Sequence, residues 1–72
     1  MVKNILVTGG GGHIGTVLSQ ELLKKGYIVK VLDNFMYGEY LEDQINLIKI
    51  IGDIRDNNLV DKALENTDCV IH

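Results

Sequence analysis

The sequence of 72 residues lacks the features that build cross-linked or metal-centred domains. It contains a single cysteine, Cys69, which excludes an internal disulfide, and nothing in it has the spacing of a closed zinc site. His13 and His72 have no partner ligands at a useful spacing, so we expect no bound metal. Proline is absent, and therefore interrupts none of the predicted elements.

Long apolar runs and an excess of basic charge are also lacking. No stretch is long enough to cross a bilayer, and no basic segment precedes an apolar one as in a signal peptide. The formal net charge of -3 argues against affinity for nucleic acid or an anionic membrane. We therefore expect a cytoplasmic protein with neither of these as a partner. Because 46% of the residues are hydrophobic, disorder is not expected either.

Short apolar runs alternate with amphipathic segments along the chain. Strands are predicted at residues 4–8, 28–32, 45–51 and 69–71, and helices at 13–25 and after Asp56, a candidate N-cap. Each helix is expected to bury one stripe of side chains: Ile14, Val17, Leu18 and Leu22 in the first, and Leu59, Val60, Ala63 and Leu64 in the second. Cys69 is expected to be a small buried side chain. Strands that alternate with helices predict an α/β fold with a parallel sheet.

Four consecutive glycines separate the first predicted strand from the first helix. Gly9, Gly12 and Gly15 have the spacing G-x-x-G-x-x-G. In such a junction the first glycine permits the turn, the second lets a ligand approach the backbone, and the third lets the helix pack closely on the sheet. The backbone N–H groups around His13 and Ile14 then form a site for a pyrophosphate at the start of the helix.

Two other interpretations of the glycines are open. A flexible linker is disfavoured because the strand and the helix adjoin the glycines directly. A P-loop would use Gly10 and Gly15, but Thr16 stands where its lysine is needed.

Asp33 follows the second predicted strand, about 20 residues beyond the glycines, where a dinucleotide site needs an acidic residue. Its carboxylate accepts hydrogen bonds from the ribose hydroxyls of NAD and repels the additional phosphate of NADP, so NAD is the predicted cofactor. The alternative is a residue that merely ends the strand in a turn.

Four segments carry a resemblance to a known family: VTGGGGHIG, VLDN, GDIRD and DCVIH. With them, the chain resembles the N-terminal part of an extended short-chain dehydrogenase/reductase, and more narrowly the NAD-dependent nucleotide-sugar epimerases and dehydratases. The resemblance implies a partial Rossmann fold, with a parallel sheet of about four strands in the order 3-2-1-4 and flanking helices. It also implies a fragment, in which residues 1–72 are the N-terminal part of a single NAD(P)-binding domain.

The same resemblance implies roles for three more residues. Asp53 would accept a hydrogen bond from the adenine amino group, Ile54 would lie beside the adenine ring, and Asn34 would line the adenosine pocket. Asp53 could instead begin a turn ahead of Asp56, and Ile54 could be an ordinary packing residue.

The Tyr-x-x-x-Lys pair on which the family's reaction depends is missing from this sequence. Tyr27 and Lys30 are one residue too close, and Leu41 and Gln44 stand where Tyr37 and Tyr40 would need a lysine. We therefore expect no catalytic residue here, and a role as the NAD-binding half of a larger enzyme that acts on a nucleotide sugar. The alternatives are a non-catalytic dinucleotide-binding protein and an inactive fragment that associates with a second copy as a homodimer.

Overall fold

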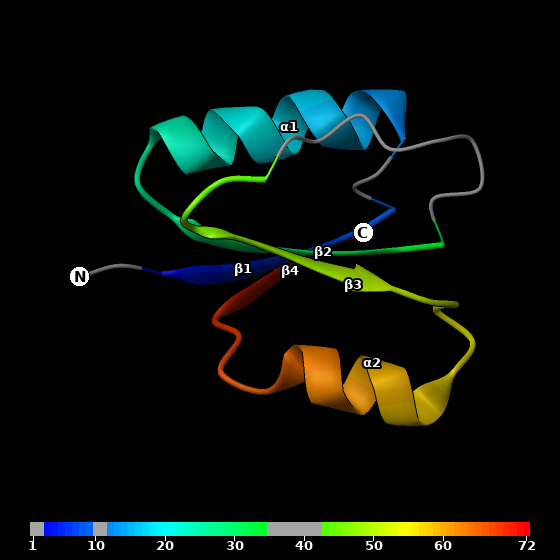
Figure 1. Cartoon of the computed structure of the whole chain (residues 1–72). Coiled ribbons are helices and arrows are strands. Elements are labelled where there is room, and N and C mark those ends of the chain that lie inside the picture. Colours follow the sequence, from blue (N-terminus) through cyan, green and yellow to red (C-terminus); the bar gives the residue numbers. More distant parts are fainter. Residues whose placement is uncertain (1–2, 10–11, 35–42) are drawn as a thin grey trace.

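The computed structural model describes residues 3–9, 12–34 and 43–72. They form, in order, β1 (Asn4–Thr8), α1 (His13–Lys24), β2 (Ile28–Asp33), β3 (Leu47–Ile51), α2 (Asn57–Leu64) and β4 (Cys69–Ile71). All three strand pairings are parallel, and the sheet has the order β3-β2-β1-β4. Figure 1 shows α1 on one face of this sheet and α2 on the other. The predicted partial Rossmann fold and its strand order are confirmed.

Two apolar clusters fill the space between the sheet and the helices. Because successive strand side chains point to opposite faces, β1 and β2 contribute to both clusters. Ile5, Val7, Val29 and Val31 pack with residues of α1, and Leu6 and Leu32 pack with Ala63 of α2. The two central strands are therefore buried on both faces, as their almost wholly apolar sequences predict.

The buried face of α1 is rotated from the predicted one. Ile14 and Val17 are 82% and 52% exposed, whereas Ser19, on the opposite side of the helix, is fully buried. Leu18 and Leu22 pack against the cluster as predicted, together with Leu23. The buried side chain of Ser19 is small, and this lets the helix approach the sheet closely. The apolar pattern alone did not predict this rotation of the helix.

Three further predictions of burial or extent are wrong at the edges of the structure. Ile45 is predicted to lie in a strand but is 99% exposed, because Leu47 N–H donates to Gln44 O (3.2 Å) in a turn that precedes β3. Leu64 is 43% exposed at the last position of α2, and Cys69 is exposed on the edge strand β4. Leu59, Val60 and Ala63 do form the buried side of α2.

Backbone hydrogen bonds end α1 at Gly26. Gly26 adopts a φ of +89°, its N–H donates to Leu23 O (3.0 Å), and Tyr27 N–H donates to Leu22 O (3.2 Å). This pair of bonds is the Schellman motif, which satisfies carbonyl groups of the last helical turn.

Lys30 joins β2 to the end of α2. Its Nζ donates to the backbone oxygens of Glu65 and Ala63, the latter at 3.4 Å, and to Thr67 Oγ1 at 3.4 Å. The aliphatic stem crosses the packed layer while the cation lies at the negative end of the helix dipole.

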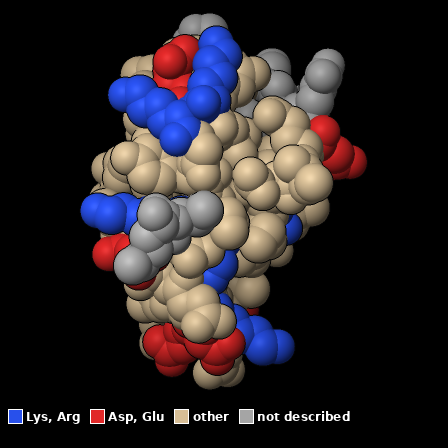
Figure 2. Space-filling model, turned by 90° about the vertical axis from the view of Figure 1, so that its left-hand side faces the viewer, with Lys and Arg blue, Asp and Glu red and all other residues tan. Residues whose placement is uncertain are grey.

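Charged side chains of both signs are mixed on the surface. On the face in Figure 2, basic and acidic groups lie next to each other at both ends, and charged groups of both signs are also scattered over the mostly uncharged surface between them. Lys24 Nζ and Glu21 Oε1 are 3.4 Å apart in one such exposed pair. In the described ranges no helix is long and apolar enough to cross a membrane.

Candidate functional site

The turn after β1 has the geometry that its first glycine was predicted to provide. Gly9 has a φ of +71°, in the left-handed region that glycine adopts without a Cβ penalty. Its N–H donates to Leu32 O (2.8 Å) on β2. This bond extends the pairing of β1 with β2 by one residue beyond the end of β1. Gly12 N–H then donates to Gly9 O (3.2 Å) and closes the turn. Gly10 and Gly11 lie outside the described residues.

The N-cap residue of α1 is Gly12, which makes no side-chain capping hydrogen bond. Gly12 is extended (φ -76°, ψ 178°), and no acidic residue lies in the first turn. Thr16 N–H and Thr16 Oγ1 both donate to Gly12 O, at 2.9 and 2.7 Å. The N–H groups of His13, Ile14 and Gly15 precede the first intrahelical donor, so they have no partner within the helix. Together with the positive end of the helix dipole, they suit an anionic ligand.

Asp33 and Asn34 lie where β2 ends, next to the end of β3. Asp33 O accepts a hydrogen bond from Gly52 N–H (3.0 Å), which ties the two strand ends together. Gly52 packs tightly against α2, since a Cβ on it would lie 2.0 Å from Leu59 Cδ2. This contact sets the path of the chain into Asp53 and Ile54.

Asp53 is held by its neighbour Arg55. Arg55 Nη2 donates to Asp53 Oδ2 (2.6 Å), Arg55 Nε contacts both carboxylate oxygens (3.1 and 3.0 Å), and Arg55 N–H donates to Oδ1 (2.8 Å). These hydrogen bonds, with the guanidinium charge, lower the pKa of Asp53 to about 2. The carboxylate is therefore ionised and acts only as a hydrogen-bond acceptor at neutral pH.

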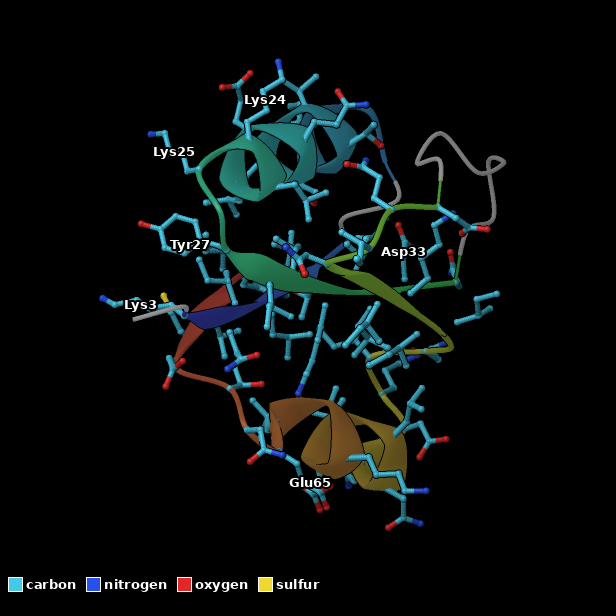
Figure 3. All side chains as sticks on the ribbon, turned by 60° about the vertical axis from the view of Figure 1, so that its left-hand side comes forward. Lys3, Lys24, Lys25, Tyr27, Asp33 and Glu65 are labelled. Carbon is cyan, nitrogen blue, oxygen red and sulfur yellow. The ribbon has the colours of Figure 1, made fainter. Side chains whose placement is uncertain are left out.

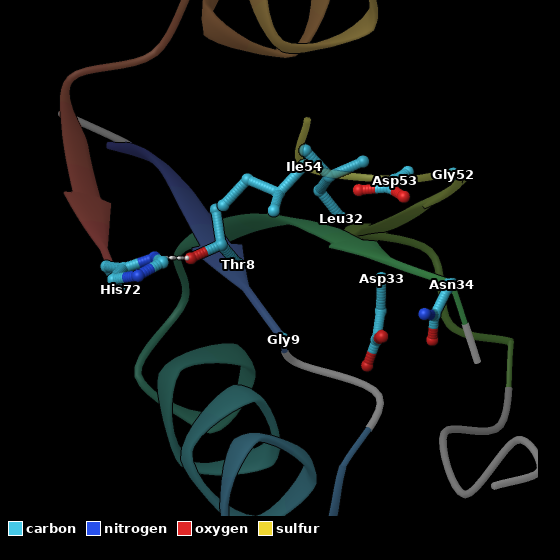
Figure 4. Close-up of a pocket in the computed structure, with 9 residues that line it drawn as sticks. All are labelled: Thr8, Gly9, Leu32, Asp33, Asn34, Gly52, Asp53, Ile54 and His72. Atoms are coloured by element: carbon cyan, nitrogen blue, oxygen red, sulfur yellow. Dashed lines mark hydrogen bonds between the residues drawn. The ribbon is translucent and has the colours of Figure 1, made fainter. Parts of the chain in front are cut away.

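The carboxyl ends of the four strands surround one pocket of about 210 Å³ (Figure 4). Five of the predicted site residues line it: Gly9, Asp33, Asn34, Asp53 and Ile54. This is the edge at which open parallel sheets bind their ligands.

Gly12, Ile14 and Gly15 are not among the described residues that line this pocket. Gly12, His13, Ile14 and Gly15 form the start of α1, a short turn beyond Gly9. The sequence prediction missed Thr8, Leu32, Gly52 and His72, which also line the pocket. Each of them lies at or directly after the end of a predicted strand, and that position is the signal that could have identified them.

Tyr27 lies at the other end of the sheet. It directly precedes β2, whereas Asp33 ends that strand, and Figure 3 shows the two side chains at opposite ends. Tyr27 and Lys30 are not among the described residues that line the pocket. Tyr37 and Tyr40 lie outside the described residues.

The sequence profile of the NAD dependent epimerase/dehydratase family matches residues 5–72. The chain belongs to this family. NAD, the cofactor predicted from the sequence, is the family's cofactor, and the resemblance found in the four sequence segments is confirmed.

Individual relatives agree with this assignment. The chain is 40% identical to a UDP-N-acetyl-alpha-D-glucosaminuronate decarboxylase of Bacillus cytotoxicus, covering 100% of the chain and 23% of the relative. It is 39% identical to the UDP-glucose 4-epimerase of Bifidobacterium longum, covering 99% of the chain and 24% of that enzyme. Its fold matches the crystal structure of the Bordetella bronchiseptica enzyme WbmH in complex with NAD+, with a TM-score of 0.90 and 34% identity, over 100% of this chain and 26% of that one. The chain thus spans about a quarter of the length of these relatives.

Proposed function

We propose that this chain binds the adenosine and diphosphate portions of NAD, as the cofactor half of an enzyme that epimerises or dehydrates a nucleotide sugar. The observation that carries the proposal is the pocket itself, which brings Gly9, Asp33 and Asp53 together from three strands. Its polar groups match the chemistry of the ligand. Carboxylates accept hydrogen bonds, and the ribose hydroxyls and the adenine amino group donate them.

The adenosine would occupy the side of the pocket formed by β2 and β3. Asp33 would accept from the ribose hydroxyls, and Asp53 from the adenine amino group, with Ile54 beside the ring and Asn34 at the rim. Asp53 is suited to this role because its low pKa keeps it an acceptor over the whole neutral range. A second negative charge from the 2′-phosphate of NADP would lie against Asp33, so NAD is the preferred dinucleotide.

The diphosphate would lie over Gly9 and Gly12, at the start of α1. A Cβ on Gly12 would have Gly9 O at 3.6 Å as its nearest neighbour, which is an ordinary contact. Packing against the described residues therefore does not require a glycine at this position, and the missing side chain leaves room among them for an external group. The N–H groups of His13, Ile14 and Gly15 would donate to the phosphate oxygens.

When bound, NAD supplies hydride transfer at a sugar carbon, and the protein supplies its position and electrostatic surroundings. The groups that exchange protons with the sugar would come from outside these residues, because the described pocket contains no tyrosine. We propose that residues 1–72 are the N-terminal part of one NAD-binding domain, which is supported by relatives of which the chain covers 23% and 24%.

Calorimetric titration with NAD and NADP tests this assignment. Asp33→Ala should weaken NAD binding by about 1–3 kcal/mol, since it leaves ribose hydroxyls without their acceptor, and should reduce the preference for NAD over NADP. Asp61→Ala, which removes an exposed carboxylate of α2, is the matched control and should change neither. Equal binding of NAD and NADP by the unaltered chain would contradict the role of Asp33.

Two alternatives make different predictions. A non-catalytic dinucleotide-binding protein would bind NAD equally well, but its gene would encode no Tyr-x-x-x-Lys in the same reading frame. Self-association as a homodimer is favoured by the edge strand β4, on which Val70 is 47% exposed. Light scattering that gives the mass of one chain would exclude the homodimer.

We propose that the protein is cytoplasmic, because the reducing environment of the cytoplasm suits the exposed thiol of Cys69.

A further inference from the structure

Thr8 and His72 form a pair across the ends of β1 and β4. The parallel register pairs Val7 with Ile71, so the next residue of each segment lies beside the other. Thr8 Oγ1 is 2.6 Å from His72 Nδ1 and 3.5 Å from Ile71 O, and Figure 4 shows the imidazole joined to the threonine at the pocket wall. This short bond fixes the ring through Nδ1, and Nε2 is the ring nitrogen that it does not use.

The acidic residues and the histidine of the pocket lie on opposite sides of it. In the strand order β3-β2-β1-β4, Asp53 and Asp33 belong to the β3 and β2 side, and His72 belongs to the β4 side. Among the nine described lining residues, His72 is the one whose side chain can carry a positive charge. A ligand that matches this arrangement has hydrogen-bond donors at one end and an anionic group toward the other.

The Thr8 bond is compatible with an imidazole that offers Nε2–H. When the Thr8 hydroxyl donates to Nδ1, the neutral ring carries its proton on Nε2. When the ring is protonated, both nitrogens donate and the Thr8 hydroxyl can turn to Ile71 O. In both of these states Nε2–H is a donor, whereas the neutral tautomer with its proton on Nδ1 would donate to Thr8 and offer no hydrogen at Nε2.

We propose that His72 is a binding residue for the diphosphate of the ligand, through Nε2–H, and that Thr8 positions its ring. This inference rests on the proposed function, since Asp33 and Asp53 hold the adenosine end of the same ligand. It adds a side-chain contact to a diphosphate site otherwise made of backbone N–H groups. The chemical class recognised is a nucleoside diphosphate, whether free or within a dinucleotide.

Titrations of the 72-residue chain with adenosine, ADP and NAD separate this contact from the others. His72→Asn keeps an amide where Nδ1 stands, and so keeps the bond to Thr8, but has no atom at the place of Nε2. We expect ADP and NAD to bind about 3- to 10-fold more weakly, the effect of one hydrogen bond, and adenosine to bind unchanged. His72→Gln, which extends an amide toward the place of Nε2, should restore much of the ADP affinity.

The positioning role of Thr8 is tested in the same way. Thr8→Val removes the hydroxyl at nearly constant volume and should weaken ADP but not adenosine, while Thr8→Ser should behave like the unaltered chain. Thr67→Val is the matched control, because Thr67 Oγ1 bonds to Ala63 O and Lys30 Nζ, at the end of α2 and away from the described lining of the pocket. Thermal unfolding of each variant shows whether the comparison is made on folded protein.

The possible outcomes separate the two proposals. If His72→Asn weakens the binding of adenosine and of ADP equally, or changes neither, the proposed role of His72 is wrong, but the proposed NAD site is not contradicted. If the unaltered chain binds none of the three ligands, the proposed function is wrong, and the role of His72 falls with it.

Discussion

The two helices begin in opposite ways, although each follows a strand of the same parallel sheet. The N-cap residue of α2 is Asp56, whose carboxylate accepts a hydrogen bond from Leu59 N–H (3.2 Å). The N-cap residue of α1 is Gly12, which has no side chain to accept such a hydrogen bond. A capping side chain satisfies a backbone donor that the helix itself leaves unpaired. One helix start is thus closed by a carboxylate of the chain, and the other is left open to an anionic group from outside.

The glycines near the two helices differ in the same sense. Gly52 packs against α2, and a Cβ on it would lie 2.0 Å from Leu59 Cδ2, so the end of that side chain would have to shift. Among the described residues, a Cβ added to Gly12 would meet Gly9 O at an ordinary 3.6 Å. The comparison teaches that one glycine serves the fold, whereas the other leaves space beside an uncapped helix, as a binding loop requires.

The largest effect should come from closing the open helix start. Gly12→Asp places a carboxylate where the diphosphate is proposed to lie, and juxtaposed like charges cost several kcal/mol. We expect NAD binding to fall by about 100-fold or more in calorimetric titration. The melting temperature should stay the same or rise, because aspartate caps a helix slightly better than glycine does. Retention of NAD affinity by this variant would show that the diphosphate lies elsewhere.

The contrast between the two glycines is tested by adding one methyl group at each. Gly52→Ala should lower the free energy of unfolding by about 1 kcal/mol, the low end of the cost of overpacking, because the end of the Leu59 side chain must shift. Gly12→Ala should leave stability nearly unchanged and weaken NAD binding. Urea unfolding and titration of the two variants measure both quantities. Similar losses of stability in both variants would contradict the division of roles.

Removal of the α2 cap should have the next largest effect. Asp56→Ala removes the acceptor for Leu59 N–H and should lower the free energy of unfolding by about 1 kcal/mol. Thermal unfolding should show this as a decrease in Tm of roughly 4–8 °C for a chain of this size. NAD affinity should not change, since Asp56 lies outside the pocket. A loss of affinity in the folded variant would mean that the start of α2 also contributes to binding.

The smallest effect concerns the second carboxylate near α2, Asp53. Its pKa of about 2 lies below the value of 3.8 for an unpaired aspartate, because of the bonds from Arg55. A lowered pKa in the folded state means that the contribution to stability is present above pH 3.8 and is lost as the pH falls toward 2. Arg55→Gln should therefore reduce stability slightly at pH 6, and the difference between the two proteins should vanish toward pH 2. Urea unfolding at a series of pH values measures this difference, and a gap independent of pH would contradict it.

The local sequence signals predicted most of the fold. The apolar runs of β1 and β2 and the cap at Asp56 each act over a few residues, and the structure has them as predicted. Because parallel strands end at the same edge, the positions of Gly9, Asp33 and Asp53 after three strands also predicted that they would meet.

The errors arose where tertiary packing decides between similar patterns. Leu18 and Leu22 fit two rotations of α1, and only the sheet selects the one that buries Ser19 and exposes Val17. Ile45 looks like part of a strand, but the turn at Gln44 delays the pairing until Leu47. The contact between Thr8 and His72 joins residues 64 positions apart and depends on a strand register that neither segment specifies alone.

The most direct test of the dinucleotide site is a titration of the isotope-labelled chain with NAD, followed by the backbone amide resonances in NMR. We expect the largest shifts at Gly12 and Ile14, at the open start of α1, and at Asp33 and Asp53, with little change at the capped start of α2 around Leu59. Shifts that concentrate at α2, or no shifts at all with NAD in excess, would contradict the claim that the uncapped helix and the adjoining strand ends form the dinucleotide site.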